Sequence, residues 1–156
     1  RGSAGRWPAA PPRRTTMRPT ITATDWKHQP LPERHVSLPL DFHLDAVESA
    51  CVRHGLLPLD MEDKWFLYYE GTTLHMHRSW TGFCIAQVHF VPEGEGLHAV
   101  SAGINRDPMQ YTSSDDAADI ALIESMVRGI GASQRYIEQR QAGDHGWLVV
   151  TPADPH

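Results

Sequence analysis

The densest group of polar and aromatic side chains lies between residues 75 and 82, in the segment HMHRSWTG. In it, the guanidinium of Arg78 directly follows His77 and stands two residues before the indole of Trp80. Arginine makes charge-assisted, often bidentate, hydrogen bonds to phosphate, and tryptophan offers a flat surface for stacking. These residue types predict a site for a phosphorylated ligand that contains a ring.

A second polar group, Asn105-Arg106-Asp107-Pro108, follows a predicted strand and precedes a predicted helix. The start of a helix offers free N–H groups and the positive end of a dipole, which suit phosphate. Asp107, Asp115 and Asp116 would repel an anion, so a turn followed by a capped helix is the structural alternative. The predicted ligand-binding residues are His77, Arg78, Trp80, Asn105 and Arg106.

Arg78 also has a structural interpretation. Strand alternation places it on the same face as Leu74 and Met76. If that face is buried, the guanidinium needs a carboxylate, because an unpaired ion is costly to desolvate. The candidate partners are acidic residues near the second helix: Asp107, Asp115, Asp116 and Asp119. The sequence leaves both a structural ion pair and an anion-binding role open.

His75 and His77 alternate on one strand face and could share a metal, with His89 or His98 as a third ligand. No HExxH or CxxC motif accompanies them, so we predict no metal site and no cofactor. Cys84 alternates with apolar residues, and no GxSxG or P-loop is present. No catalytic residue is assigned, although His77 or an aspartate acting as an acid or base stays open.

Three segments in a fixed order form a wider pattern: KWF from Lys64, HRSWTG from His77 and NRDP from Asn105. The pattern resembles a small, largely uncharacterised bacterial domain that is loosely associated with proteins of ADP-ribose metabolism. The resemblance covers about residues 60–131. It implies a ligand of the ADP-ribose type and carries no catalytic assignment.

Hydrophobic periodicity predicts the elements that must position these residues. A helix is expected over residues 41–54, with Asp41 as its cap and Leu44, Val47, Cys51 and Val52 as its apolar stripe. Strands are expected over residues 64–70, 73–80, 83–91 and 97–104, and a second helix after Ser113 or Ser114. Residues 134–141 could form a short polar helix and residues 147–150 a last strand. The predicted fold is α+β: an antiparallel four-stranded meander with two helices on one face, a two-layer sandwich.

Residues 1–38 are rich in Pro and Arg and lack periodicity, which predicts a disordered or extended arm that is dispensable for folding. A single domain follows over residues 39–150, and residues 151–156 form a tail. The strand over 64–70 has aromatic side chains on both faces. One face therefore needs cover from the arm, a partner or a planar ligand. The alternative function is a protein–protein interaction module that uses this face or the arm, with no catalysis.

Composition excludes some classes of function. The net charge of -5 argues against nucleic acid and anionic membranes as partners, and no apolar run reaches the roughly 20 residues that a membrane helix needs. The two cysteines, Cys51 and Cys84, fall in different elements and are predicted to be free thiols. Free thiols indicate a reducing compartment, so we expect a cytoplasmic protein.

Overall fold

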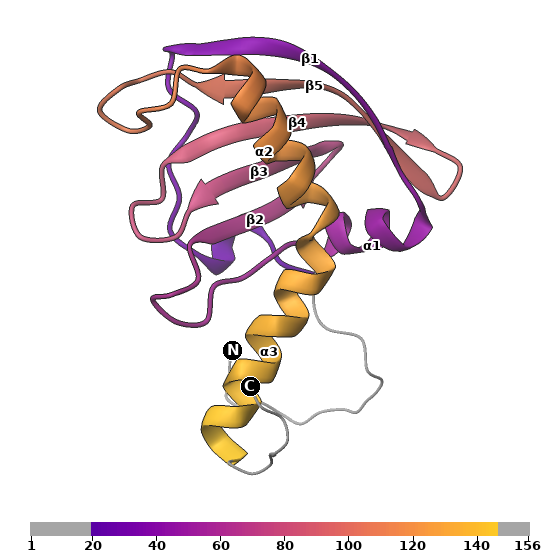
Figure 1. Cartoon of the computed structure of the whole chain (residues 1–156), viewed down its shortest axis with the longest axis vertical. Helices are drawn as coiled ribbons and strands as arrows, with labels where there is room; N and C mark the ends of the chain where they lie inside the picture. The colour runs from indigo at the N-terminus through magenta and orange to yellow at the C-terminus, as the bar shows by residue number, and fades with distance from the viewer. Residues whose placement is uncertain (1–19, 147–156) are drawn as a thin grey trace.

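The computed structural model describes residues 20–146 and has an α+β fold built on one antiparallel sheet (Figure 1). The strands are β1 (His35–Leu44), β2 (Trp65–Glu70), β3 (Thr73–Arg78), β4 (Cys84–Glu93) and β5 (Gly96–Asn105). The helices are α1 (Ala46–His54), α2 (Asp116–Arg128) and α3 (Ile130–Gly146), preceded by the 3-10 turn η1 (Ala23–Asp25). The strand order β1-β5-β4-β3-β2 places the first strand beside the last. The predicted class and meander are confirmed, but within the described residues the sheet has five strands rather than four and there are three helices rather than two.

The additional strand is β1, whose last residues the sequence analysis assigned to a helix. Residues 41–44 continue the alternation of buried and exposed side chains that runs along β1. The helix begins only at Ala46, after a capping box in which Asp45 accepts a hydrogen bond from the backbone of Glu48. Asp41 is therefore not a helix cap, and Val47, predicted to be buried, is exposed.

The core lies between the sheet and the helices. In Figure 1, α2 crosses one face of the sheet and α3 extends beyond it, past β2. Leu74 and Met76 of β3 pack in this core with Ile123 and Val127 of α2 and Ile130 of α3. Helical spacing predicts a buried stripe of Ile120, Ile123, Val127 and Ile130, and in the structure Ile120 is half-buried and the other three are buried. Burial of such side chains contributes about 1.5–3 kcal/mol each.

The C-terminal helices differ from the prediction at their boundaries. Asp115, rather than Ser113 or Ser114, caps α2 by accepting a hydrogen bond from the backbone of Ala118. Gly129 separates α2 from α3, and α3 starts at Ile130 rather than near Gln134. The strand predicted over residues 147–150 and the tail lie outside the described residues.

The other face of the sheet is partly covered by the segment over residues 21–28. Ile21 and Trp26 pack with Phe66 and Tyr68 of β2 in a second apolar cluster. The indole of Trp26 also donates a 2.7 Å hydrogen bond to the carbonyl of Ser79. The sequence analysis expects the arm, a partner or a planar ligand to cover one face of the aromatic strand. In the structure, the N-terminal segment of the chain itself covers Phe66 and Tyr68.

These contacts change the view of the N-terminal arm. Residues 1–19 lie outside the described residues, residues 21–28 cover the sheet, and residues 35–44 form β1. The proposed domain boundary at residue 39 therefore falls inside a strand. Cys51 and Cys84 are both free thiols, as predicted. Within residues 20–146, no helix has the length and apolar character needed to cross a membrane.

Candidate functional site

A cleft of about 470 Å³ opens between the end of the sheet, the β3–β4 turn and the loop that leads to α2. Its volume lies within the range of small-molecule sites, roughly 300–1,000 Å³. Phe83 and Ile85 are apolar residues of its wall. The other lining residues are polar, charged or aromatic: Lys64, Arg78, Trp80, Thr81, Gln110, Tyr111 and Thr112. None of these lining residues is acidic.

Two cations line the cleft, and each lies over a tryptophan ring. The guanidinium of Arg78 lies 5.0 Å from the centre of the Trp65 ring, and the ammonium of Lys64 lies 5.0 Å from that of Trp80. Such contacts orient a cation without cancelling its charge. Both cations are solvent-exposed, and neither forms an ion pair with another residue of the described chain. The cleft therefore presents positive charge although the protein is acidic.

The ion pair predicted for Arg78 is made by another arginine. Arg106 contacts Asp116 at 2.7 Å and the buried carboxylate of Asp119 at 2.8 Å. Arg78 does lie on the face of Leu74 and Met76, as alternation predicted, but it ends the strand and its side chain emerges at the surface. The structural interpretation of Arg78 is therefore wrong.

Asn105 and Arg106 lie behind the cleft rather than on its surface. Asn105 is fully buried, and its amide donates to the side chain of Gln110 at 2.9 Å and to the carbonyl of Cys84 at 2.8 Å. Arg106 forms an ion pair with Asp119, and the carboxylate of Asp119 accepts a hydrogen bond from the hydroxyl of Tyr111. Gln110 and Tyr111 line the cleft. Asn105 and Arg106 thus fix the side chains of one cleft wall.

The electrostatics of Tyr111 exclude it as a base. Burial, followed by the hydrogen bond to Asp119, raises the pKa of Tyr111 to about 12. The phenol is therefore protonated at neutral pH. Its proton is directed to Asp119, so the hydroxyl oxygen offers the cleft only acceptor capacity.

His77 fixes the turn that carries Trp80. Its side chain is only 2% exposed, and its Nδ1 lies 3.0 Å from the carbonyl oxygen of Gly82. Because a carbonyl only accepts, Nδ1 carries the proton and donates. Burial lowers the pKa of His77 to about 4, so the imidazole is neutral, and its Nε2 has no hydrogen-bond partner in the described part of the chain. His77 supports the cleft from behind and does not line it.

The turn also depends on Gly82. Its backbone N–H donates to the carbonyl of Arg78 at 2.8 Å. Its φ of 81° lies in the left-handed region, and a Cβ would come within 3.2 Å of the Cα of His28. Glycine is the residue that tolerates both conditions.

The remaining groups considered for chemistry do not converge. Burial raises the pKa of Cys84 to about 12, which makes the thiol a poor nucleophile. The rings of His75 and His77 both stack on Tyr68. Nδ1 of His75 lies 3.4 Å from Nε2 of Gln87, and Nδ1 of His89 contacts the hydroxyl of Thr73. These histidines do not form a group of three metal ligands in the part of the chain that the structure describes.

The structure thus divides the five predicted ligand-binding residues into two sets. Arg78 and Trp80 line the cleft, whereas His77, Asn105 and Arg106 lie in the layer behind it. Lys64, Gln110 and Tyr111 line the cleft but were not selected as site residues. Lys64 is the first residue of the KWF segment, and Tyr111 lies three residues after the NRDP segment. Their place in the pattern is the sequence signal that could have identified them as site residues.

Comparison with known proteins adds no assignment. Neither the family models, nor the curated proteins, nor the solved structures with which the chain was compared gave a match.

Proposed function

We propose that the cleft beside Arg78 binds a phosphorylated, nucleotide-like small molecule such as ADP-ribose. The observation that carries the proposal is the pair of exposed cations, Lys64 and Arg78, in a cleft without an acidic lining residue. An anion entering the cleft would find charge that no carboxylate within residues 20–146 has neutralised.

The aromatic side chains suit the rest of such a ligand. Trp80 is 56% exposed, and its Nε1–H donates to the carbonyl of Met61 at 2.8 Å, which holds the ring in place. A fixed, exposed indole is a stacking surface for a base. Gln110, held by Asn105, supplies a polar group that can select between ring edges. The resemblance to the KWF–HRSWTG–NRDP domain supports the same ligand class.

The alternative, a protein–protein interaction module, has lost part of its basis. Phe66 and Tyr68, which supplied an aromatic face for a partner, pack under residues 21–28. That proposal now depends on the Pro-rich segment, of which residues 1–19 lie outside the described part of the chain. We therefore rank ligand binding first.

Calorimetry with ADP-ribose, ADP, NAD and AMP at moderate salt tests the proposal. Hydrogen bonds to a charged group contribute about 1.5–3 kcal/mol each. Lys64→Gln and Arg78→Gln should therefore each weaken binding by about tenfold or more. Arg53→Gln, an exposed arginine of α1 outside the cleft, is the matched control and should bind normally. No saturable binding at millimolar ligand, or binding that survives both cleft substitutions, would reject the proposal.

A further inference from the structure

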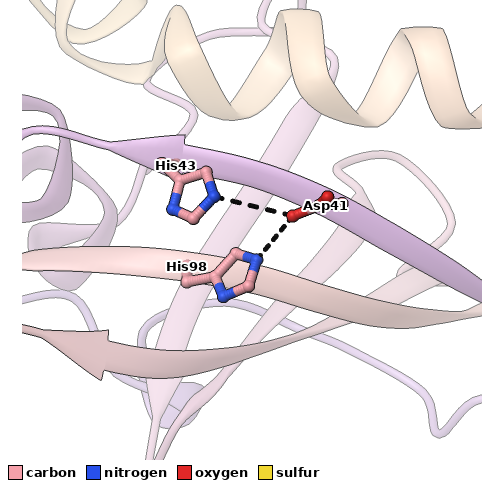
Figure 2. A group of neighbouring side chains, drawn as sticks. All are labelled: Asp41, His43 and His98. Carbon is pink, nitrogen blue, oxygen red and sulfur yellow. Dashed lines mark hydrogen bonds and ion pairs between the residues drawn. The ribbon is translucent and has the colours of Figure 1, made fainter.

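A second polar group lies across β1 and β5 (Figure 2), on the exposed face of β1, and none of its residues lines the cleft. Asp41 and His43 alternate along β1 and therefore project from the same face. His98 of β5 is directly opposite His43 in the strand register. The two imidazoles stack, with ring centres 4.1 Å apart and an interplanar angle of 9°.

The stacked rings direct one nitrogen each toward the same carboxylate oxygen. Nε2 of His98 lies 2.7 Å from Oδ1 of Asp41, and Nε2 of His43 lies 3.5 Å from it. These ligand atoms all lie within 4.8 Å of one another. Neighbouring ligands of one zinc ion, each about 2.0–2.1 Å from the metal, are separated by roughly 3.0–3.4 Å. Small side-chain rotations would therefore let the group surround a single ion.

A fourth residue, Glu93, orients one of the ligands. Its Oε1 lies 2.9 Å from Nδ1 of His43 and can accept the proton of that nitrogen. In the neutral imidazole, this proton position leaves Nε2 of His43 with a lone pair, which faces an oxygen of Asp41 that also carries lone pairs. Two acceptors in this arrangement are stabilised by a cation between them. A carboxylate that orients a histidine in this way is a regular feature of protein metal sites.

We propose that Asp41, His43 and His98 bind one divalent transition-metal ion of the zinc class, with Glu93 as the orienting carboxylate. Two imidazoles and one carboxylate suit zinc, nickel or copper, whereas magnesium and calcium prefer oxygen ligands. The side chains of Asp41, His43 and His98 are 81%, 55% and 27% exposed. The remaining coordination positions therefore face solvent and are open to water or an anion.

This site differs from the one that sequence considered. The sequence suggests His75 and His77 as a pair of ligands, with His89 or His98 as a third, and predicts no metal site. The DxH pair in β1 was overlooked because residues 41–44 were assigned to a helix, where Asp41 and His43 would not share a face.

The test is metal binding by the full chain after dialysis against a chelator. Calorimetry with Zn²⁺, and absorption of the Co²⁺ form, should show one ion per chain at micromolar affinity. His43→Asn and His98→Asn should each weaken that binding by about tenfold or more and alter the Co²⁺ spectrum. Glu93→Gln should weaken it less and keep the stoichiometry. His35→Asn, an exposed histidine on the same face of β1, is the matched control and should leave binding unchanged.

Thermal melts in chelator test whether the variants fold. We expect them to fold, because all of the substituted side chains are at least partly exposed. No stoichiometric binding at 100 µM Zn²⁺ (roughly a hundredfold above a micromolar constant) would overturn the proposal. Equal binding by the wild type, His43→Asn and His98→Asn would place the metal elsewhere and overturn it too. So would a preference for Mg²⁺ over Zn²⁺.

Discussion

The imidazole of His77 is buried, makes one hydrogen bond and has one nitrogen without a partner among residues 20–146, and we expect this to make stability depend on pH. Burial is the largest influence and lowers the pKa of His77 to about 4, against the hydrogen bond to Gly82, which raises it; the nearby His28 and His75 lower it by smaller amounts. In the unfolded chain the pKa is near 6.5. Between these values the unfolded state binds more protons, so the free energy of unfolding falls as the pH decreases.

We predict that the protein loses stability as the pH falls from about 6.5 to about 4, by roughly 3 kcal/mol at most from His77. His77→Asn keeps a donor for the Gly82 carbonyl but does not titrate. The variant should be less stable at pH 7.5, yet lose less on acidification than the wild type. Urea unfolding at pH 7.5 and pH 4.5 measures both quantities. Equal losses in the two proteins would show that His77 does not cause the dependence.

Side-chain identity alone could not distinguish the roles of the two arginines in the candidate site. Alternation correctly placed Arg78 with Leu74 and Met76, but it could not show that the strand ends there and releases the guanidinium to the surface. Arg106 follows β5 directly, and the loop after it returns Asp116 and Asp119 to its side chain. That pairing depends on the path of the loop, which local sequence does not specify.

At the scale of elements, the network around Asp119 ties the loop after β5 to the first turn of α2. Asp119 is only 3% exposed and accepts hydrogen bonds from Tyr111 and Ser113 in addition to its ion pair with Arg106. A buried carboxylate that loses its cation is costly to the folded state. This dependence distinguishes Arg106 from the exposed Arg78.

Arg106→Met should therefore lower the free energy of unfolding by about 3–5 kcal/mol, the usual result of removing one partner of a buried pair. Arg78→Met should lower it by less than about 1 kcal/mol, because the exposed Arg78 pairs with no carboxylate among the described residues. Urea unfolding of both variants at pH 7.5 gives the comparison. A larger loss for Arg78→Met than for Arg106→Met would contradict the roles assigned here.

The elements with strong periodicity could be predicted from the sequence, and those with competing signals could not. The strands from Trp65 onward and the stripe of α2 follow from alternation and helical spacing. In β1, Leu38, Leu40, Phe42 and Leu44 alternate as well, but Pro39 and an acidic residue before an apolar run favoured a disordered arm and a helix cap. Pairing with β5, a contact between distant residues, decides the outcome in favour of a strand.

For the whole molecule, the order of strands places the first strand beside the last. The first strand closes the sheet against the last, and the segment before it returns across the outer face to cover β2. Neither arrangement has a local sequence signal, because each joins residues far apart in the chain. Because of these contacts we expect residues 20–30 to contribute to stability, whereas composition predicts an arm that is dispensable for folding.

We expect deletion of residues 20–30 to destabilise the fold. The deletion removes the buried side chain of Ile21, the hydrogen bond from Trp26 to Ser79, and the cover over Phe66 and Tyr68. Burying one large apolar side chain contributes about 1.5–3 kcal/mol, and the hydrogen bond about 1 kcal/mol. Part of this gain offsets the entropy lost on ordering the segment, so that deletion should lower the free energy of unfolding by roughly 2–3 kcal/mol.

The chain that starts at Leu31 should therefore melt about 5–15 °C below the chain that starts at Thr20. It should also bind a dye specific for exposed apolar surface, because the aromatic side chains of β2 become accessible. Comparing these two chains isolates residues 20–30 from everything before them. Equal melting midpoints without dye binding would show that the outer face of β2 is stable without this cover.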